Sequence, residues 1–163
     1  MASVAVAKAI RKVYGLKAEL KWPNDVLLEG KKVCGILAEM EAEVDAINYV
    51  NLGIGINANF PISQYERGAT SLRAELGREV SRREFFDALL TEIAAQQSLL
   101  TGNGLLEEWR SLSATLNREV RVVAPGEEII GWAVDVDTSG ALIVRSGDGS
   151  LRSAVAGDCI HLS

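Results

Sequence analysis

One segment of the sequence, residues 48–57, has two faces of very different chemistry. Side chains along a β-strand alternate between the two sides of a sheet. Over residues 50–57, one side carries only aliphatic residues, and the other carries only amides and glycines. The aliphatic residues are Val50, Leu52, Ile54 and Ile56, and those on the other side are Asn51, Gly53, Gly55 and Asn57. The pattern predicts a strand over 47–57 whose aliphatic side joins a hydrophobic core.

The glycine side of this strand is the first candidate for a functional surface. Glycine weakens a strand and leaves its face without a side chain. Either a ligand or a closely packed helix could lie against the backbone at Gly53 and Gly55, and the segment alone does not decide between them. The pair is not a dinucleotide-binding fingerprint, because a third glycine and a following helix are missing.

Hydrophobic periodicity predicts the elements before and after this strand. Val6, Ile10 and Val13 recur at helical spacing, and Gly15 is a typical helix stop. We expect a helix over 4–14, a strand over 18–21, a hairpin formed by 26–28 and 32–41, the strand over 47–57 and an irregular segment over 58–80.

Two further helices are expected after residue 80. Ser81 and Glu84 form a capping box, which predicts a helix that runs to about residue 100. Its expected buried stripe is Phe85, Phe86, Leu89, Leu90, Ile93 and Leu99, and a second helix over 105–112 carries Leu105, Trp109 and Leu112 on one face.

The character of the chain changes after the second of these helices. Short strand-like segments are separated by Pro125-Gly126, Ser139-Gly140 and Gly147-Asp148-Gly149, which is typical of a small β-barrel or sandwich. We therefore predict an α+β fold with two domains, over 1–114 and 115–163.

Composition excludes several classes of protein. With 48% apolar and 24% charged residues the chain is not a disordered tail, and no apolar run approaches the length that spans a bilayer. A net charge of −5 disfavours binding to nucleic acid. The first residues lack a secretion signal, so we expect a cytoplasmic protein that does not bind membranes.

The cysteines and the histidine predict little chemistry of their own. Cys34 and Cys159 lie in apolar, strand-like contexts and are expected to be small buried residues in a reducing compartment. His161 has no potential zinc ligands at the usual spacing.

Charged residues gather around the predicted hairpin. Lys21-Trp22-Pro23-Asn24-Asp25 precedes it, and Lys32 lies on its second arm. A lysine suits a phosphate or carboxylate, and an aspartate suits Mg²⁺, so the two arms could face one site. Taken alone, Asp25 is also a good turn former.

These segments together resemble the biotin protein ligase family. The resemblance rests on the runs 21–25, Gly30-Lys31-Lys32-Val33-Cys34-Gly35-Ile36-Leu37-Ala38-Glu39 and 51–57, in this order and spacing. The helix at 105–110 and the β-rich C-terminal part agree with it. The family implies part of a class II synthetase-like mixed sheet with helices, followed by a small SH3-like barrel.

The resemblance also implies an activity. The family joins biotin to ATP, giving biotinyl-5′-AMP and pyrophosphate, and then transfers biotin to a lysine of a biotin carboxyl carrier protein. By this resemblance Lys32 and Asp25 are catalytic, and Asp25 also holds Mg²⁺. The biotin-binding residues are Lys32, Gly35 and Ile36, and the nucleotide-binding residues are Lys21, Asn24, Asn57, Gly53 and Gly55.

The sequence departs from the family in one respect. The family's Thr-Asn motif and its glycine- and arginine-rich loop, which close over biotin and the adenylate, do not occur here. We therefore expect little activity from this chain alone, an uncovered sheet edge, and association with a second copy or with a separate chain that carries the upstream half. Three alternatives remain. The chain could be a non-catalytic module that binds biotin, adenylate or a carrier; it could be a lipoate ligase-like protein; or it could be an inactive fragment.

Overall fold

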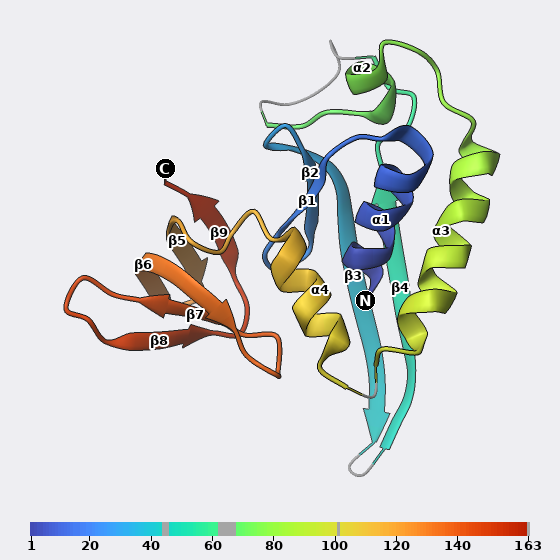
Figure 1. The fold of residues 1–163 in the computed structure, drawn as a ribbon. Helices are drawn as coiled ribbons and strands as arrows, with labels where there is room; N and C mark the ends of the chain where they lie inside the picture. Colours follow the sequence, from blue (N-terminus) through green and yellow to red (C-terminus); the bar gives the residue numbers. More distant parts are fainter. Residues whose placement is uncertain (44–45, 62–67, 101, 163) are drawn as a thin grey trace.

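The computed structural model describes residues 1–43, 46–61, 68–100 and 102–162, and it contains two antiparallel sheets (Figure 1). The first sheet has the strand order β1-β2-β3-β4, and the second has the order β8-β7-β6-β5-β9. The strands are β1 (Ala18–Lys21), β2 (Asp25–Leu28), β3 (Lys31–Glu43), β4 (Ala46–Ile56), β5 (Glu119–Ala124), β6 (Glu127–Val136), β7 (Leu142–Arg145), β8 (Leu151–Ala154) and β9 (Asp158–His161). The expected α+β class is confirmed.

The helices belong mainly to the first sheet. They are α1 (Ala2–Tyr14), the short α2 (Leu72–Leu76), α3 (Arg82–Gln97) and α4 (Gly104–Leu112). In Figure 1, α1 and α3 lie beside the first sheet, and α4 lies between this sheet and the second one. In the described part of the chain no helix is long and apolar enough to cross a membrane.

Local chemistry explains several element boundaries. Gly15 ends α1 in the left-handed conformation, with φ of 68°. Glu29 and Gly30 both have positive φ, 48° and 72°, as the two central residues of a tight hairpin turn between β2 and β3 require. The side chain of Ser81 accepts a hydrogen bond from the amide of Glu84 and so caps α3.

A bulge in the hairpin decides which side chains share a face. Val26 pairs with Cys34, whereas Leu27 pairs with Lys32, so Val33 is an extra residue in β3. Without it, Lys32 and Gly35 would lie on opposite sides of the sheet, because they are three positions apart. The bulge puts both of them on the side of the sheet that carries Asp25.

The hydrophobic core of the first sheet lies on the other side. Seven residues of α1 are buried, and all of them except Ala2 belong to one cluster with alternate residues of the strands. The strand residues in this cluster include Ala18, Leu20, Val26, Leu28, Cys34, Ile36, Ile54 and Ile56. The aliphatic side of β4 therefore joins the core at Ile54 and Ile56, as its alternation predicts. Val50 and Leu52, which the same alternation assigns to the core, are 50% and 42% exposed, so the prediction is wrong for them.

The predicted buried stripe of α3 is partly wrong. Phe85 and Leu89 are buried, but Phe86 and Leu90 are 54% and 49% exposed. Their side of the helix borders an apolar groove of about 620 Å³ between α3 and β4, which Leu52 and Ile54 also line. In the described part of the chain, no strand pairs with the outer edge of β4.

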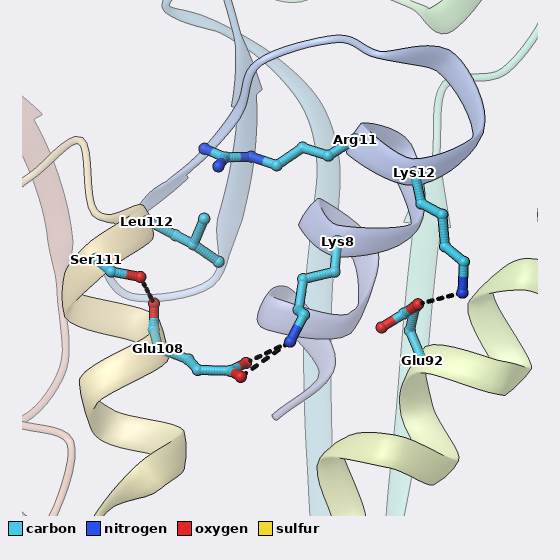
Figure 2. Close-up of a pocket in the computed structure, with 7 residues that line it drawn as sticks. All are labelled: Lys8, Arg11, Lys12, Glu92, Glu108, Ser111 and Leu112. Carbon is cyan, nitrogen blue, oxygen red and sulfur yellow. Dashed lines mark hydrogen bonds and ion pairs between the residues drawn. The ribbon is translucent and has the colours of Figure 1, made fainter.

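Ion pairs join α1 to the other two long helices (Figure 2). The ammonium of Lys8 lies 2.9 Å from the Glu108 carboxylate of α4, and that of Lys12 lies 3.0 Å from the Glu92 carboxylate of α3. Arg11 donates to the carbonyl oxygen of Ala18. The hollow of about 520 Å³ between these helices is thus bordered by charges that already have partners.

Candidate functional site

Four strands contribute one residue each to a single row across the first sheet. Lys21 pairs with Asp25, Asp25 with Gly35, and Gly35 with Gly55. Directly opposed residues of neighbouring strands point to the same side of a sheet. The row therefore passes from two charged side chains to two positions of bare backbone.

Lys32 and Asp25 meet above this row. The Nζ atom of Lys32 lies 2.6 Å from Oδ1 of Asp25. The lysine side chain is 47% exposed and the aspartate 16%, so the carboxylate is largely covered while the ammonium still faces solvent. A Cβ at Gly35 would lie 3.0 Å from Cε and 3.1 Å from Nζ of Lys32. The lysine thus occupies the space that a side chain at position 35 would need.

The ammonium borders a hollow of about 270 Å³. Gly35, Gly55, Asn57 and Ala69 line it together with Lys32. The structure thus brings four of the predicted site residues to one place. Gly53 is two positions from Gly55 along β4 and continues the bare floor on the same side of the sheet.

The glycines of β4 are not required by packing within the described chain. A Cβ at Gly53 would have its nearest neighbour at 3.7 Å, the carbonyl oxygen of Leu37, and a Cβ at Gly55 would lie 3.7 Å from that of Gly35. Both glycines are exposed, and the helices lie on the opposite side of the sheet. Among the described residues, therefore, no helix packs on the bare face, and the floor is open for a ligand.

A segment that sequence reasoning left without a role forms one wall of the hollow. The amide of Lys32 donates to the carbonyl oxygen of Gly68, and the amide of Thr70 donates to that of Lys32, so residues 68–70 run alongside the start of β3. Asn57 donates its side-chain amide to the carbonyl oxygen of Thr70. The one sequence signal nearby is Ser71, whose side chain caps α2.

Other predicted site residues lie outside the hollow. Ile36 is next to Gly35 on the same strand, so its side chain lies on the helix side of the sheet and packs against the core, away from the hollow. A contact between biotin and the backbone of Ile36 stays a prediction. Asn24 is exposed, and its side-chain amide donates to the carbonyl oxygen of Ile36. Lys21 lies at the far end of the row, beyond Asp25.

The cysteine beside the site is buried, and its surroundings disfavour the thiolate. Burial, together with the nearby Asp25 carboxylate, raises the pKa of Cys34 to about 12, although Lys32 acts in the opposite direction. A thiol with such a pKa stays protonated at neutral pH. Cys34 and Cys159 are both buried and unpaired with each other, as their apolar contexts predict.

The site offers one carboxylate to a metal ion. Among the residues that the structure describes, no group of three or more histidine, cysteine and acidic side chains could hold a metal. Asp25 can supply one carboxylate oxygen to a Mg²⁺, an ion that proteins often hold by one or two carboxylates together with water and phosphates. The arrangement as a whole is a cation at the rim of a bare backbone floor, which suits an anionic group on a flat ligand.

Family models match two parts of this chain. The model of the Biotin/lipoate A/B protein ligase family matches residues 1–57, and that of the Biotin protein ligase C terminal domain matches residues 115–162. The first match ends at Asn57, so it contains each of the site residues named from the sequence.

Individual relatives are similar over most of this chain. It is 37% identical over 147 residues to the biotin–[acetyl-CoA-carboxylase] ligase of Mycobacterium tuberculosis, covering 88% of this chain and 53% of the relative. It is 31% identical over 157 residues to the bifunctional ligase/repressor BirA of Bacillus subtilis, covering 91% and 48%. The chain thus spans about half the length of these relatives.

A solved structure extends the similarity to the fold. The biotin protein ligase of Aquifex aeolicus in complex with biotin and ATP superimposes with a TM-score of 0.78 at 26% identity, over 98% of this chain and 68% of that one. Sequence and fold agree across both sheets, and the chain therefore belongs to the biotin protein ligase family.

Proposed function

We propose that this chain supplies the lysine-bearing half of a site that activates biotin with ATP and transfers it to a lysine of a carrier protein. The observation that carries the proposal is the Lys32 ammonium, held by Asp25 at the edge of the open backbone of Gly35 and Gly55. A flat bicyclic acid can lie against bare backbone and present its carboxylate to the ammonium. The proposed substrates are biotin, ATP and the carrier's lysine.

The proposed reaction has two steps. A carboxylate oxygen of biotin forms a bond to the α-phosphorus of ATP, and the bond from that phosphorus to the bridging oxygen breaks, which releases pyrophosphate. The amine of the carrier lysine then attacks the acyl carbon, loses a proton and displaces AMP. Negative charge concentrates between the carboxylate and the α-phosphate in the first step, and a positioned cation stabilises it there.

Neighbouring residues complete this proposal. Asp25 orients Lys32 and supplies one carboxylate to a Mg²⁺ that screens phosphate charge. Asn57 donates its side-chain amide to Thr70, and within the described residues its side-chain oxygen has no hydrogen bond, so we assign that oxygen to the ligand. Lys21 lies on the same side of the sheet and adds a second positive charge near the nucleotide.

We propose that the groove beside α3 and the outer edge of β4 receive the rest of the catalytic fold. The chain spans about half the length of its relatives, so the remaining length of such a protein can provide strands for this edge, from the same or a separate chain. Self-association through the same surface is the alternative, because an unpaired apolar strand edge recruits another strand.

Biotin-dependent exchange of pyrophosphate into ATP tests the proposed function. We expect little exchange with residues 1–163 alone and recovery when the upstream half of a relative's catalytic domain is added. Binding of a non-hydrolysable biotinyl-adenylate without exchange in the reconstituted protein would instead favour a non-catalytic binding module. Exchange that depends on lipoate and not on biotin would favour a lipoate ligase.

A further inference from the structure

Trp22 precedes the turn over residues 23–25, which carries Asp25 and is called the site turn below. Its side chain, however, packs in the core of the second sheet. It lies between Lys21 and the Pro23–Asp25 turn, yet its indole is 3% exposed and packs in the core of the second sheet. The core residues around it include Val120, Val122, Ala133, Val136 and Leu142. The indole nitrogen donates to the carbonyl oxygen of Gly140, at 3.0 Å.

The backbone of Trp22 is held by a second contact. Its amide donates to Oγ1 of Thr115, at 3.0 Å, and Thr115 is completely buried. The same oxygen lies 3.0 Å from Nε2 of His161 on β9. Thr115 therefore connects the residue before the site turn to the last strand of the second sheet.

The charge state of His161 follows from its partners. Arg118 lies 2.9 Å from Nδ1, and a guanidinium can only donate, so Nδ1 accepts and the hydrogen is on Nε2. The neutral ring then donates to Thr115. Burial, Arg118 and Lys21 together lower the pKa of His161 to about 4, which agrees with a neutral ring at pH 7.

We propose that Thr115 is a positioning residue for the ligase site, acting through Trp22 to fix the backbone that carries Asp25. This inference rests on the proposed function for its catalytic meaning. Thr115 accepts one hydrogen bond from Trp22 and one from His161, so it joins the site turn to the second sheet at a point that water does not reach.

The turn transmits this position because it is held at both ends. At one end Trp22 is fixed by Thr115 and Gly140. At the other, Asn24 exchanges two hydrogen bonds with the backbone of Ile36, one through its carbonyl oxygen and one through its side-chain amide. A shift of Trp22 therefore has to be absorbed between Pro23 and Asp25, next to the partner of Lys32.

Three variants of the full chain test this proposal. Thr115→Val keeps the shape of the side chain but removes the acceptor, and Thr115→Ser keeps the hydroxyl. Val122→Ala is the matched control, because it loosens the same core and accepts no hydrogen bond from Trp22. Nuclear magnetic resonance then reports the amide shifts of residues 22–25 and the exchange rate of the Trp22 amide.

We expect Thr115→Val to move the amide signals of Asn24 and Asp25 and to speed exchange of the Trp22 amide about tenfold relative to Val122→Ala. Thr115→Ser should restore both. The proposal is overturned if Thr115→Val changes only signals in the second sheet, or if Val122→Ala moves residues 22–25 equally.

Binding of a non-hydrolysable biotinyl-adenylate to the reconstituted protein tests the positioning role of Thr115 separately from the proposed ligase function. We expect several-fold weaker binding for Thr115→Val and normal binding for Thr115→Ser. If the unmodified protein binds no adenylate but the amide signals still respond as expected, the proposed function fails while the positioning by Thr115 stands. Normal binding by Thr115→Val despite shifted signals would contradict its role in the site.

Discussion

The Lys32 ammonium and the Asp25 carboxylate lie 2.6 Å apart, with Gly35 beneath the end of the lysine side chain. The carboxylate comes from one arm of a hairpin and the ammonium from the other, and the bulge at Val33 places both on one side of the sheet. Asp25 is largely covered and holds one side of the Lys32 ammonium, which restricts the conformations of the lysine side chain. The rest of the ammonium stays accessible to an anion.

Replacement of this lysine tests its role directly. In the reconstituted protein we expect Lys32→Ala to lower biotin-dependent pyrophosphate exchange by about a hundredfold or more, since it removes the positive charge from the reacting carboxylate. Lys31→Ala is the control, because its side chain is exposed at the adjacent position. Full exchange by Lys32→Ala would refute the assigned role.

Because the backbone floor at Gly55 is open, we expect Gly55→Ala to weaken ligand binding without reducing the stability of the fold. The added Cβ meets only the Gly35 carbonyl oxygen, at an ordinary 3.7 Å, and alanine is no worse than glycine in a strand. We expect unchanged or slightly higher stability in urea but weaker binding of biotinyl-adenylate by calorimetry. A large loss of stability with intact binding would show that the glycine serves the fold.

The histidine of β9 predicts a defined pH dependence of stability. The pKa of His161 falls from 6.5 in the unfolded chain to about 4 in the fold, so the unfolded state binds more protons between these values. Stability is therefore lost as the pH falls from about 6.5 towards 4. Because the ring is only half buried, we expect a loss on the order of 1 kcal/mol, allowing for solvent screening.

Urea unfolding of the unmodified protein and His161→Gln, measured from pH 7 down to pH 4.5, checks this expectation. Glutamine does not titrate, so its stability should fall less steeply over that interval, while the carboxylates contribute equally to both proteins. If the two proteins lose stability equally as the pH falls, the pKa of His161 is not lowered in the folded state.

The groove beside α3 predicts association. We expect the chain alone to sediment as more than a monomer at low micromolar concentration. Phe86 and Leu90 leave an apolar surface beside the outer edge of β4, which pairs with no strand of the described residues. Leu90→Lys should weaken this association without unfolding the helix. Thr91→Lys changes a different side of α3 and should leave the association unchanged. A clean monomer of the unmodified chain would contradict self-association.

The sequence predicts the elements better than their surroundings. The helix stop at Gly15, the Ser81 cap and the hairpin formed by 26–28 and 32–41 all follow from local signals, and each is confirmed. Helical spacing predicts that Phe86 is buried, and this prediction is wrong, because Phe86 is 54% exposed. Spacing shows which residues share a face, but not whether another element covers that face.

Local sequence patterns predict only part of the candidate site. The glycine side of β4 follows from alternation, but the bulge at Val33 has no clear signature in the sequence, and it decides that Lys32 joins Gly35. Likewise, Trp22 packs in the core of the second sheet, although its neighbours along the chain belong to the first. Such long-range placements depend on tertiary packing, which local patterns do not encode.

The row of Lys21, Asp25, Gly35 and Gly55 crosses four strands, one residue from each. A slip of one residue in β3 would replace Gly35 on that side by Cys34 or Ile36 and fill the floor with a side chain. Grafting this site onto another scaffold would therefore require moving all four strands with their mutual offsets, because no single loop or peptide contains it.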